Sequence, residues 1–208
     1  MDTETSYDRV ADEYVQRIFN ELDHKPFDRQ VLEEFASRVR DMGLCCDMGC
    51  GPGQIARYLH ELGVNVMGVD LSLEMVIRAR RLTPAITFEQ GNMLALNVPD
   101  AAWAGIAAFY SLIHITRDDM QRALGELKRA LQRGGTLLLS FHIGDGALHL
   151  DEWWGHTVCV DFHFFQTAEM MTFLKQAGFD IEKSIEREPY PDVEHQSRRA
   201  YIFARKPD

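Results

Sequence analysis

The chain has 208 residues, 46% of them hydrophobic, and a formal net charge of −10. This length and hydrophobic fraction suffice for one domain with a sizeable core. The negative charge would repel a phosphate backbone, and no basic patch interleaved with aromatic residues offsets it, which argues against a nucleic-acid partner. No apolar run approaches the roughly 20 residues that cross a bilayer, and the start of the chain is acidic, unlike a signal peptide. We therefore expect a cytoplasmic protein with no membrane partner.

The four cysteines do not suggest a disulfide or a metal site. Cys45, Cys46 and Cys50 crowd one predicted strand and the turn after it, and Cys159 stands alone. Adjacent strand residues point to opposite faces, so Cys45 and Cys46 cannot act together. We expect all four to be small hydrophobic side chains in a reducing compartment.

The first two thirds of the chain alternate helical patterns with short apolar runs. Helical spacing predicts helices over 7–22 and 26–40, with Pro26 in the first turn of the second. Further strands are predicted at 44–50, 64–69, 86–90 and 106–110, and further helices at 53–62, 72–81 and 118–132. Ser72 is the expected N-cap of its helix, and Gly134-Gly135 is expected to end the last one. Continuous apolar strands separated by helices indicate a parallel sheet that is covered on both faces.

The last third of the chain changes character. A strand is predicted at 136–142, and a helix at 168–176 with Thr167 as its cap. Two further strands, 179–187 and 198–204, are joined by a proline-containing loop that is short enough for an antiparallel hairpin. The sequence thus predicts one α/β domain whose last strands are antiparallel.

The run Cys46–Gln54 predicts a nucleotide-binding turn. A short apolar strand ends at Asp47, glycines follow at 49, 51 and 53, and a helix begins. Glycines let the backbone approach a ligand closely, and the helix N-terminus presents free N–H groups. Asp70 ends the next strand, where an acid accepts hydrogen bonds from ribose hydroxyls. The alternative interpretation is a tight strand–helix turn with a solvated surface aspartate.

The residue after Gly53 helps to identify the nucleotide. A dinucleotide fingerprint G-x-G-x-x-G requires glycine at position 54, where this chain has Gln54. The lysine of a phosphate-binding Walker loop is also missing. A ligand that combines adenosine with an amino-acid carboxylate fits the turn better.

These segments resemble class I S-adenosylmethionine-dependent methyltransferases of the small-molecule type. The resemblance rests on 46–53, on 68–75, on Gly91-Asn92-Met93, on 110–114 and on 134–138, together with the Y-D-x-x-A-x-x-Y pattern at 7–14 and the terminal hairpin. It implies a Rossmann-like, seven-stranded, mostly parallel sheet with helices on both faces and a reversed last strand. It also implies one domain over 1–208, with a helical lid (1–41), a cofactor-binding half (42–142) and a substrate-side half (143–208).

The same resemblance implies the cofactor, the reaction and the residues of the site. The cofactor would be S-adenosyl-L-methionine, converted to S-adenosyl-L-homocysteine by in-line methyl transfer to an oxygen, nitrogen or carbon atom of a small molecule. Asp47 and the 49–53 turn would hold the methionine end, and Asp70 the ribose. The other implied cofactor-binding residues are Leu71 and Met75 on the adenine, Asn92 and Met93 at its edge, Tyr110 and Ser111 near the sulfonium, and Tyr7 and Tyr14 as a lid; within the turn they are Gly49, Cys50, Gly51 and Gly53. Asn92 replaces the acid common in this family; it keeps one acceptor oxygen but loses the charge, so adenine recognition would be retained but weaker.

The acceptor side is less defined by the sequence. Four histidines fall at 142, 149, 156 and 163 among acidic and aromatic residues, in a connection that builds the substrate pocket in this fold. Gly144, Gly146 and Gly155 prevent a helix that would align them, so we predict no metal site. His142, His114 and His163 are the candidate bases, and Trp153 and Trp154 join His142 and His163 as candidates for lining the pocket; ordinary packing stays an equal alternative. A nicotinamide-dependent reductase and a non-catalytic cofactor-binding module are the remaining functional alternatives.

Overall fold

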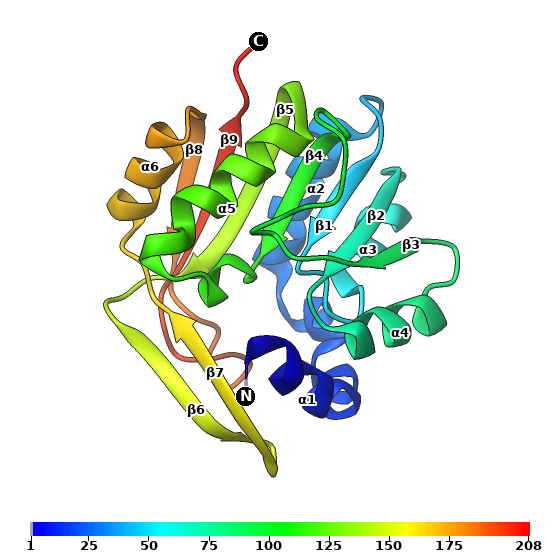
Figure 1. Cartoon of the computed structure of the whole chain (residues 1–208), viewed down its shortest axis with the longest axis vertical. Helices are drawn as coiled ribbons and strands as arrows, with labels where there is room; N and C mark the ends of the chain where they lie inside the picture. Colours follow the sequence, from blue (N-terminus) through cyan, green and yellow to red (C-terminus); the bar gives the residue numbers. More distant parts are fainter. Residues whose placement is uncertain (1) are drawn as a thin grey trace.

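A seven-stranded sheet forms the centre of the computed structural model, which describes residues 2–208 (Figure 1). Its strands are β1 (Cys45–Met48), β2 (Val66–Asp70), β3 (Thr87–Gln90), β4 (Trp103–Phe109), β5 (Leu131–His142), β8 (Asp180–Arg187) and β9 (Arg199–Arg205). The order is β3-β2-β1-β4-β5-β9-β8, with the first five strands parallel and β9 antiparallel to both neighbours. The predicted Rossmann-like sheet with a reversed last strand is therefore confirmed.

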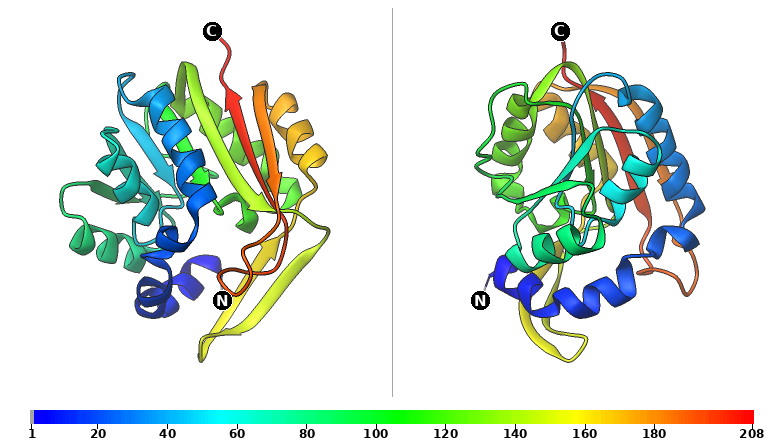
Figure 2. Two further views of the ribbon diagram at one scale, coloured as in Figure 1. Left: turned by 180° about the vertical axis from the view of Figure 1, so that it is seen from behind. Right: turned by 90° about the vertical axis from the view of Figure 1, so that its right-hand side faces the viewer.

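Helices cover both faces of this sheet (Figure 2). One face carries α5 (Arg117–Ala130) and α6 (Thr167–Gln176), and the other carries α2 (Pro26–Val39), α3 (Gln54–Glu61) and α4 (Leu73–Leu82). Short 3₁₀ turns, η1 (Glu21–His24) and η2 (Leu112–His114), connect the layers. Cys45 and Cys46 pack into different core clusters, which confirms that adjacent strand residues face opposite layers. Among residues 2–208, no helix has the length and apolar character that a membrane crossing requires.

A helix and a separate hairpin lie beyond the carboxyl ends of the parallel strands. They are α1 (Thr3–Ile18) and the antiparallel pair β6 (Ala147–Trp153) and β7 (His156–His163), which lie side by side in Figures 1 and 2. Val10, Val158 and Val160 form a small buried core between them. We call α1 and this hairpin together the lid.

The tip of the hairpin explains why this strand pair forms. Trp153 pairs with His156, so only Trp154 and Gly155 form the turn, with φ angles of 54° and 82°. Two consecutive positive φ values are the mark of a type I′ turn, whose twist suits a two-residue hairpin. The 143–165 region thus contains two strands, where the sequence analysis describes only a connection.

Several predicted boundaries were wrong. The helix before β5 ends at Ala130 and β5 begins at Leu131, so Gly134-Gly135 lie in a strand. A Cβ on Gly135 would come within 2.8 Å of the Ala104 carbonyl oxygen, so close strand packing explains that glycine. Helix α6 begins at Thr167, and Gln166 has the extended cap conformation instead. Helix α1 stops at Ile18, and residues 21–24 continue as the η1 turn.

Candidate active site

A cavity of about 660 Å³ lies between the carboxyl ends of the parallel strands and the lid. It opens beside β1, the strand between β2 and β4, which is the switch point where ligands bind in open α/β sheets. The cavity is lined by eleven of the residues expected to bind cofactor: Tyr7, Tyr14, Gly49, Cys50, Gly51, Asp70, Leu71, Asn92, Met93, Tyr110 and Ser111. The structure thus brings together residues from positions 7 to 111.

The glycine turn after β1 forms one wall of the cavity. Gly49, Gly51 and Gly53 have φ angles of 72°, 52° and 88°, all in the left-handed region. A Cβ added to Gly49 would overlap with the Cβ of Ser111, and one added to Gly53 would lie 2.7 Å from the Phe88 ring. Side chains at these positions would therefore close the cavity wall or push apart the core behind it.

Asp70 connects the glycine turn to the start of α4. One carboxylate oxygen accepts the Gly51 N–H at 2.7 Å, and the other accepts the Ser72 N–H at 2.9 Å. Burial raises the pKa of Asp70 to about 6, although these two hydrogen bonds act against the increase. A carboxylate has about four acceptor positions, so two remain for the hydroxyls of a ligand.

Three predicted cofactor contacts do not line the cavity. Asp47 is buried behind the turn, where Oδ2 accepts the Ala56 N–H at 2.9 Å in the first turn of α3. Met75 is fully buried in α4, and Gly53 is the N-cap of α3. The sequence placed them correctly in the turn and helix but could not show which atoms face inward.

The burial of Asp47 predicts that the stability of the fold depends on pH. Burial raises its pKa to about 8, against an ordinary value near 3.8. The folded carboxyl then keeps a proton that the unfolded chain has lost, so stability must fall as pH rises toward 8. Between pH 6.5 and 8, above the ordinary histidine pKa, we expect the free energy of unfolding to drop by up to about 1 kcal/mol per pH unit. Urea unfolding of the ligand-free protein measures this slope, which Asp47→Asn should abolish; an unchanged slope in the variant would contradict the assignment.

Asn92 is already engaged in a local turn. Its Oδ1 accepts the Leu94 N–H at 2.8 Å. A single lone pair on this oxygen therefore remains for a ligand, along with the two amide N–H donors. The expected weaker reading of an adenine edge stays a prediction.

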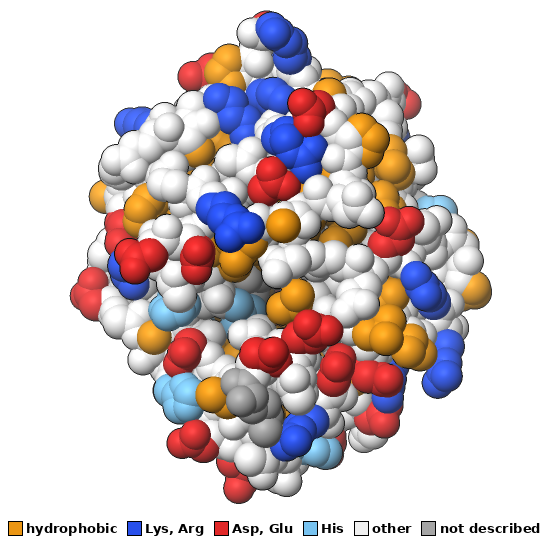
Figure 3. All heavy atoms as spheres, viewed as in Figure 1, with side chains coloured by type: hydrophobic (Ala, Val, Ile, Leu, Met, Phe, Trp, Pro, Cys, Tyr) orange, Lys and Arg blue, Asp and Glu red, His pale blue; other side chains and the backbone are white. Residues whose placement is uncertain are grey.

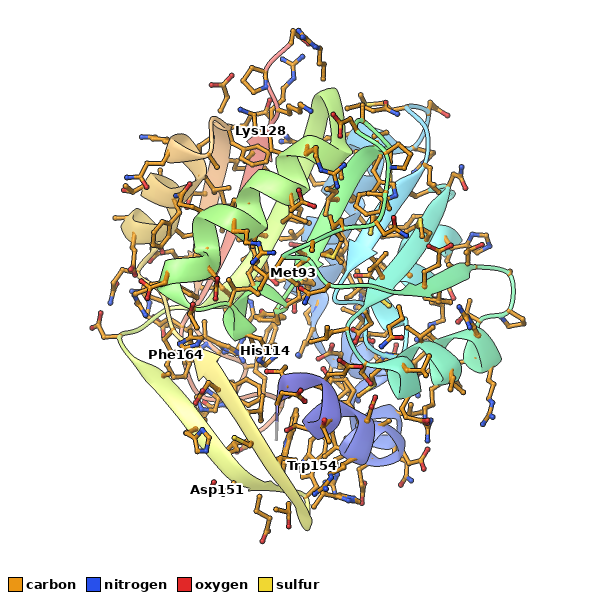
Figure 4. All side chains as sticks on the ribbon, viewed as in Figure 1. Met93, His114, Lys128, Asp151, Trp154 and Phe164 are labelled. Atoms are coloured by element: carbon orange, nitrogen blue, oxygen red, sulfur yellow. The ribbon has the colours of Figure 1, made fainter. Side chains whose placement is uncertain are left out.

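His114 joins the two halves of the lid across the cavity wall (Figure 4). Its Nδ1 lies 2.9 Å from the Asp161 carbonyl of β7, and its Nε2 lies 2.7 Å from the Tyr7 hydroxyl of α1. A carbonyl can only accept, so Nδ1 carries the hydrogen and Nε2 accepts from Tyr7 when the ring is neutral. Burial lowers the pKa of His114 to about 4, which keeps the ring neutral at pH 7. Both ring nitrogens are thus used to hold the lid.

Replacing Tyr7 by phenylalanine tests this connection. The variant leaves His114 Nε2 without its hydrogen-bond donor inside a packed lid, which costs about 1–3 kcal/mol. We expect amide hydrogens of α1 and β7 to exchange about tenfold faster in Tyr7→Phe, with exchange in β4 unchanged. Ser37→Ala, which loses an exposed hydrogen bond on α2, is the control. Uniformly faster exchange across the sheet would mean that the change is global.

Aromatic rings pack against Tyr7 and close the lid. Tyr14 and Trp153 lie with ring centroids 5.8 and 5.5 Å from that of Tyr7, in edge-to-face arrangements. Trp154 packs against Trp153 at the hairpin tip but does not line the cavity. The prediction for Trp153 therefore agrees with its position, whereas that for Trp154 does not.

The other end of the cavity holds buried charges that the sequence interpretation missed. We call Lys25, Glu194 and Arg199 the charged end. Glu194 Oε2 lies 3.0 Å from Arg199 Nε and 3.7 Å from Lys25 Nζ, and Lys25 also pairs with Glu21 at 2.5 Å. Glu21 and the three residues of the charged end all line the cavity. They come from η1, the residue before α2, the 188–198 loop and β9, which no local pattern connects.

His142 lies at the charged end and is the best-placed of the predicted bases. Burial and the nearby positive charges of Arg199 and Lys25 lower its pKa to about 3, so the ring is neutral. Ser197 Oγ lies 2.9 Å from His142 Nδ1 and 3.2 Å from His195 Nδ1. A hydroxyl has one hydrogen, so at least one of these two rings must donate to it.

The remaining histidines of the 142–163 series do not gather. His163 lies at the end of β7 and outside the cavity lining, and His149 and His156 are on the outer part of the hairpin. His149 pairs with Asp151 and Asp161 on the surface, and Asp151 points away from the body in Figure 4. Across the described chain, no group of three or more His, Cys, Asp or Glu side chains is placed to hold a metal ion.

Two buried polar atoms in the cavity wall lack partners within residues 2–208. They are Ser111 Oγ and Gln54 Oε1, which lie on either side of the glycine turn. Such atoms are normally satisfied in native proteins, so their state fits a wall that completes its hydrogen bonds with a ligand. With the glycine cradle and the free lone pairs of Asp70, the donor and acceptor set suits a nucleoside that carries an amino-acid group.

Comparisons with known proteins agree with this geometry. Residues 45–135 match the family described as "Methyltransferase domain". The chain is 31% identical over 153 residues to a malonyl-[acyl-carrier protein] O-methyltransferase of Enterobacter lignolyticus, covering 72% of this chain and 57% of the relative. The chain thus spans only about half the length of the curated relatives that it matches.

Solved structures share the fold. A S-adenosylmethionine-dependent methyltransferase from Clostridium acetobutylicum superposes with a TM-score of 0.72 at 16% identity, covering 97% of this chain and 99% of that one. One from Methanosarcina mazei gives 0.71 at 20% identity, covering 79% and 92%. The sequence matches, the fold and the cavity wall agree, and the chain therefore belongs to the class I S-adenosylmethionine-dependent methyltransferase family.

Proposed function

We propose that this protein transfers a methyl group from S-adenosylmethionine to a small-molecule acceptor. The observation that carries the proposal is the position of Asp70. Its carboxylate is fixed by the N–H groups of Gly51 and Ser72, and it shares one cavity with Tyr110 and His142. An acid suited to binding a ribose and an open space lined by titratable groups thus share one cavity, which supports the proposal.

The chain's own residues would bind and align the reactants. Asp70 would accept hydrogen bonds from the ribose, and Ser111 Oγ and Gln54 Oε1 would gain partners at the methionine end. Tyr7, Tyr14 and Trp153 would exclude water from the site. When bound, the cofactor supplies an electrophilic methyl group, so the protein acts chiefly by alignment, which can remove about 7–11 kcal/mol of barrier.

Tyr110 is a further indication of a functional wall. It follows β4 with a φ of 52°, a strained conformation for a tyrosine. Such strain costs about 1–3 kcal/mol and is concentrated at ligand-binding sites. The hydroxyl of Tyr110 contacts that of Tyr201 at 3.1 Å, which fixes the ring in the cavity wall.

A base is needed only if the acceptor atom must lose a proton. His114 is a poor candidate because both of its ring nitrogens hold the lid, and His163 lies outside the cavity lining. His142 remains the candidate that could take a proton. The name of the Enterobacter relative specifies transfer to oxygen, which favours an oxygen acceptor here.

Calorimetry followed by turnover tests the proposal. We expect micromolar binding of S-adenosylmethionine and much weaker binding of NADH, followed by acceptor-dependent release of S-adenosylhomocysteine. Tight NADH binding without S-adenosylmethionine binding would support a reductase instead. Cofactor binding without turnover on a broad acceptor panel would support a non-catalytic binding module.

A further inference from the structure

The two ends of the cavity differ in charge and in hydrogen-bonding capacity. Asp70 lies at the end next to the glycine turn, with two acceptor positions free. Lys25 and Arg199 lie at the charged end, and both are buried by more than nine-tenths. These two side chains can only donate hydrogen bonds. The cavity wall therefore presents free acceptors beside the glycine turn, and cationic donors together with Glu21 and Glu194 at the charged end.

Lys25 and Arg199 both lie close to the ring of Tyr110, which lines the cavity. Lys25 Nζ lies 5.8 Å from the centre of the Tyr110 ring, and Arg199 Cζ lies 5.9 Å from it. Tyr110 directly precedes Ser111, which contacts the glycine turn. A group held by both cations would therefore lie close to the place where the cofactor end and the acceptor end meet.

Glu194 does not use up the donors of these cations. Its Oε1 accepts Arg187 Nη1 at 2.5 Å and the Tyr190 N–H at 2.8 Å, and its Oε2 is shared by Arg187, Arg199 and Lys25. Although burial would raise it, hydrogen bonds from Arg187 and Tyr190 hold the pKa of Glu194 below its usual range, so this carboxylate is ionised. Glu194 thus contacts three cations, two of which also have carboxylates of their own, Lys25 with Glu21 and Arg187 with Asp28.

Donors remain in excess at the charged end. The ammonium of Lys25 has three N–H groups, and Glu21 takes one of them in a hydrogen bond. Arg199 donates to the Ser197 carbonyl and lies 3.0 Å from Glu194 Oε2 through its Nε, which uses two of its five N–H groups. Buried charged side chains with unused N–H groups are costly, so a ligand that supplies acceptors would stabilise this arrangement.

We propose that the methyl acceptor carries a carboxylate, which Lys25 and Arg199 bind at the charged end of the cavity. This inference rests on the proposed function and narrows the class of its substrate. The cations fix the orientation of the acceptor rather than attack or activate it. A planar carboxylate matches the guanidinium fork of Arg199, and the adjacent ammonium of Lys25 adds a point charge.

The neutral state of His142 supports this assignment. Burial is the main cause that lowers the pKa of His142, and the same two cations add to it while Glu194 acts against them. A neutral ring beside the bound carboxylate can donate or accept a hydrogen bond without adding charge. The unused N–H groups of the two cations and the neutral ring of His142 thus favour a ligand group that accepts hydrogen bonds.

Binding measurements test the inference without turnover. The protein saturated with S-adenosylhomocysteine is titrated by calorimetry with carboxylates of two to ten carbons, including benzoate and phenylacetate. The corresponding amide of each acid is titrated for comparison. We expect at least one acid to bind about tenfold or more tightly than its amide. Acids that do not bind at millimolar concentration, or amides that bind equally well, would overturn the proposal. Phenyl phosphate binding more tightly than phenylacetate would overturn the choice of carboxylate.

Two variants locate the effect. Lys25→Met combined with Glu21→Gln removes one cation and its partner charge together, and should reduce the acid-to-amide preference about fivefold or more. Arg199→Lys keeps the charge but loses the fork, and should reduce it about threefold. Lys183→Met removes an exposed cation of β8 that pairs with Glu34, and should leave the preference unchanged. A preference that survives in both cavity variants would contradict the site.

Cofactor binding separates this inference from the proposed function. Wild type and all variants are first titrated with S-adenosylmethionine. If the wild type does not bind it, the proposed function fails. If it binds the cofactor but shows no acid preference, the inference alone fails.

Discussion

Gly49→Ala is expected to abolish binding of S-adenosylmethionine. The residue has a φ of 72°, and an added methyl group would overlap with the Cβ of Ser111. Ser111 cannot move away, because it directly follows β4 and the constrained Tyr110. The turn must therefore shift into the space of the ligand. Calorimetric titration should show at least about a hundredfold loss of affinity, because a shifted loop loses several hydrogen bonds at once, each worth about 0.5–1.5 kcal/mol.

Two other glycines separate the causes of this effect. Gly146 has a similar φ of 77°, but a Cβ there would meet no atom within 4 Å, so Gly146→Ala measures backbone strain alone. Gly125 lies in the middle of α5 with equally open space, so Gly125→Ala should stabilise the fold by about 0.5–1 kcal/mol. Both variants should bind the cofactor like the wild type. Normal binding by Gly49→Ala would contradict the position of the turn.

Asp70→Asn is expected to reduce affinity for S-adenosylmethionine by about 10–100-fold, since hydrogen bonds to a charged group are worth about 1.5–3 kcal/mol. Both carboxylate oxygens already accept backbone N–H groups, so the amide NH₂ of asparagine must face one of these donors. The variant therefore loses the ribose interaction and also loosens the glycine turn. Thermal unfolding distinguishes the two losses: a change in affinity at constant melting temperature assigns the effect to ligand contact. Affinity equal to wild type would contradict the role of Asp70.

The affinity of the wild type for S-adenosylmethionine should also depend on pH, because pH changes the charge of Asp70. Burial raises the pKa of Asp70 to about 6, so the carboxyl becomes protonated as pH falls through that value. The protonated form offers fewer acceptor positions to ribose hydroxyls. Affinity for S-adenosylmethionine should therefore fall as pH is lowered from 7 to 5.

The sequence could predict most of the cofactor end because its features are local. The turn at 46–54 and the acid at the end of the next strand follow directly from strand–turn–helix geometry, and the structure places Gly49, Gly51 and Asp70 on one cavity wall. Asp47 shows the limit of that reasoning. A residue can lie in the correct turn and still point its side chain to the opposite side, toward Ala56.

The charged end could not be predicted because it is assembled from distant segments. Lys25 and Arg199 are separated by more than 170 positions, and the residues around them show no spacing typical of a binding motif. They meet only because β9 inserts between β5 and β8. The regular spacing of the histidines at 142, 149, 156 and 163 was misleading for a similar reason, since a hairpin sends its two strands in opposite directions and most of these rings outward.

The surface around the cavity is acidic. Asp and Glu side chains gather over the lower part of the face shown in Figure 3. Acidic residues of the lid include Glu4 and Asp8 of α1 and Asp151 of β6. An anionic acceptor would approach against this potential and then meet the buried cations. We expect its association rate to increase with ionic strength, because salt screens the outer charges more than the buried ones.

The lid has a much smaller hydrophobic core than the central sheet. Its shared core has three fully buried valines, each worth about 1.5–3 kcal/mol, and otherwise half-buried rings. This buried apolar surface is a small fraction of that in the central sheet. We therefore expect the lid to be the first unit to open in thermal fluctuations. Reactants and products can then exchange while the sheet stays intact. A methyltransferase built in this way would be limited by the opening of α1 against the hairpin rather than by the chemical step.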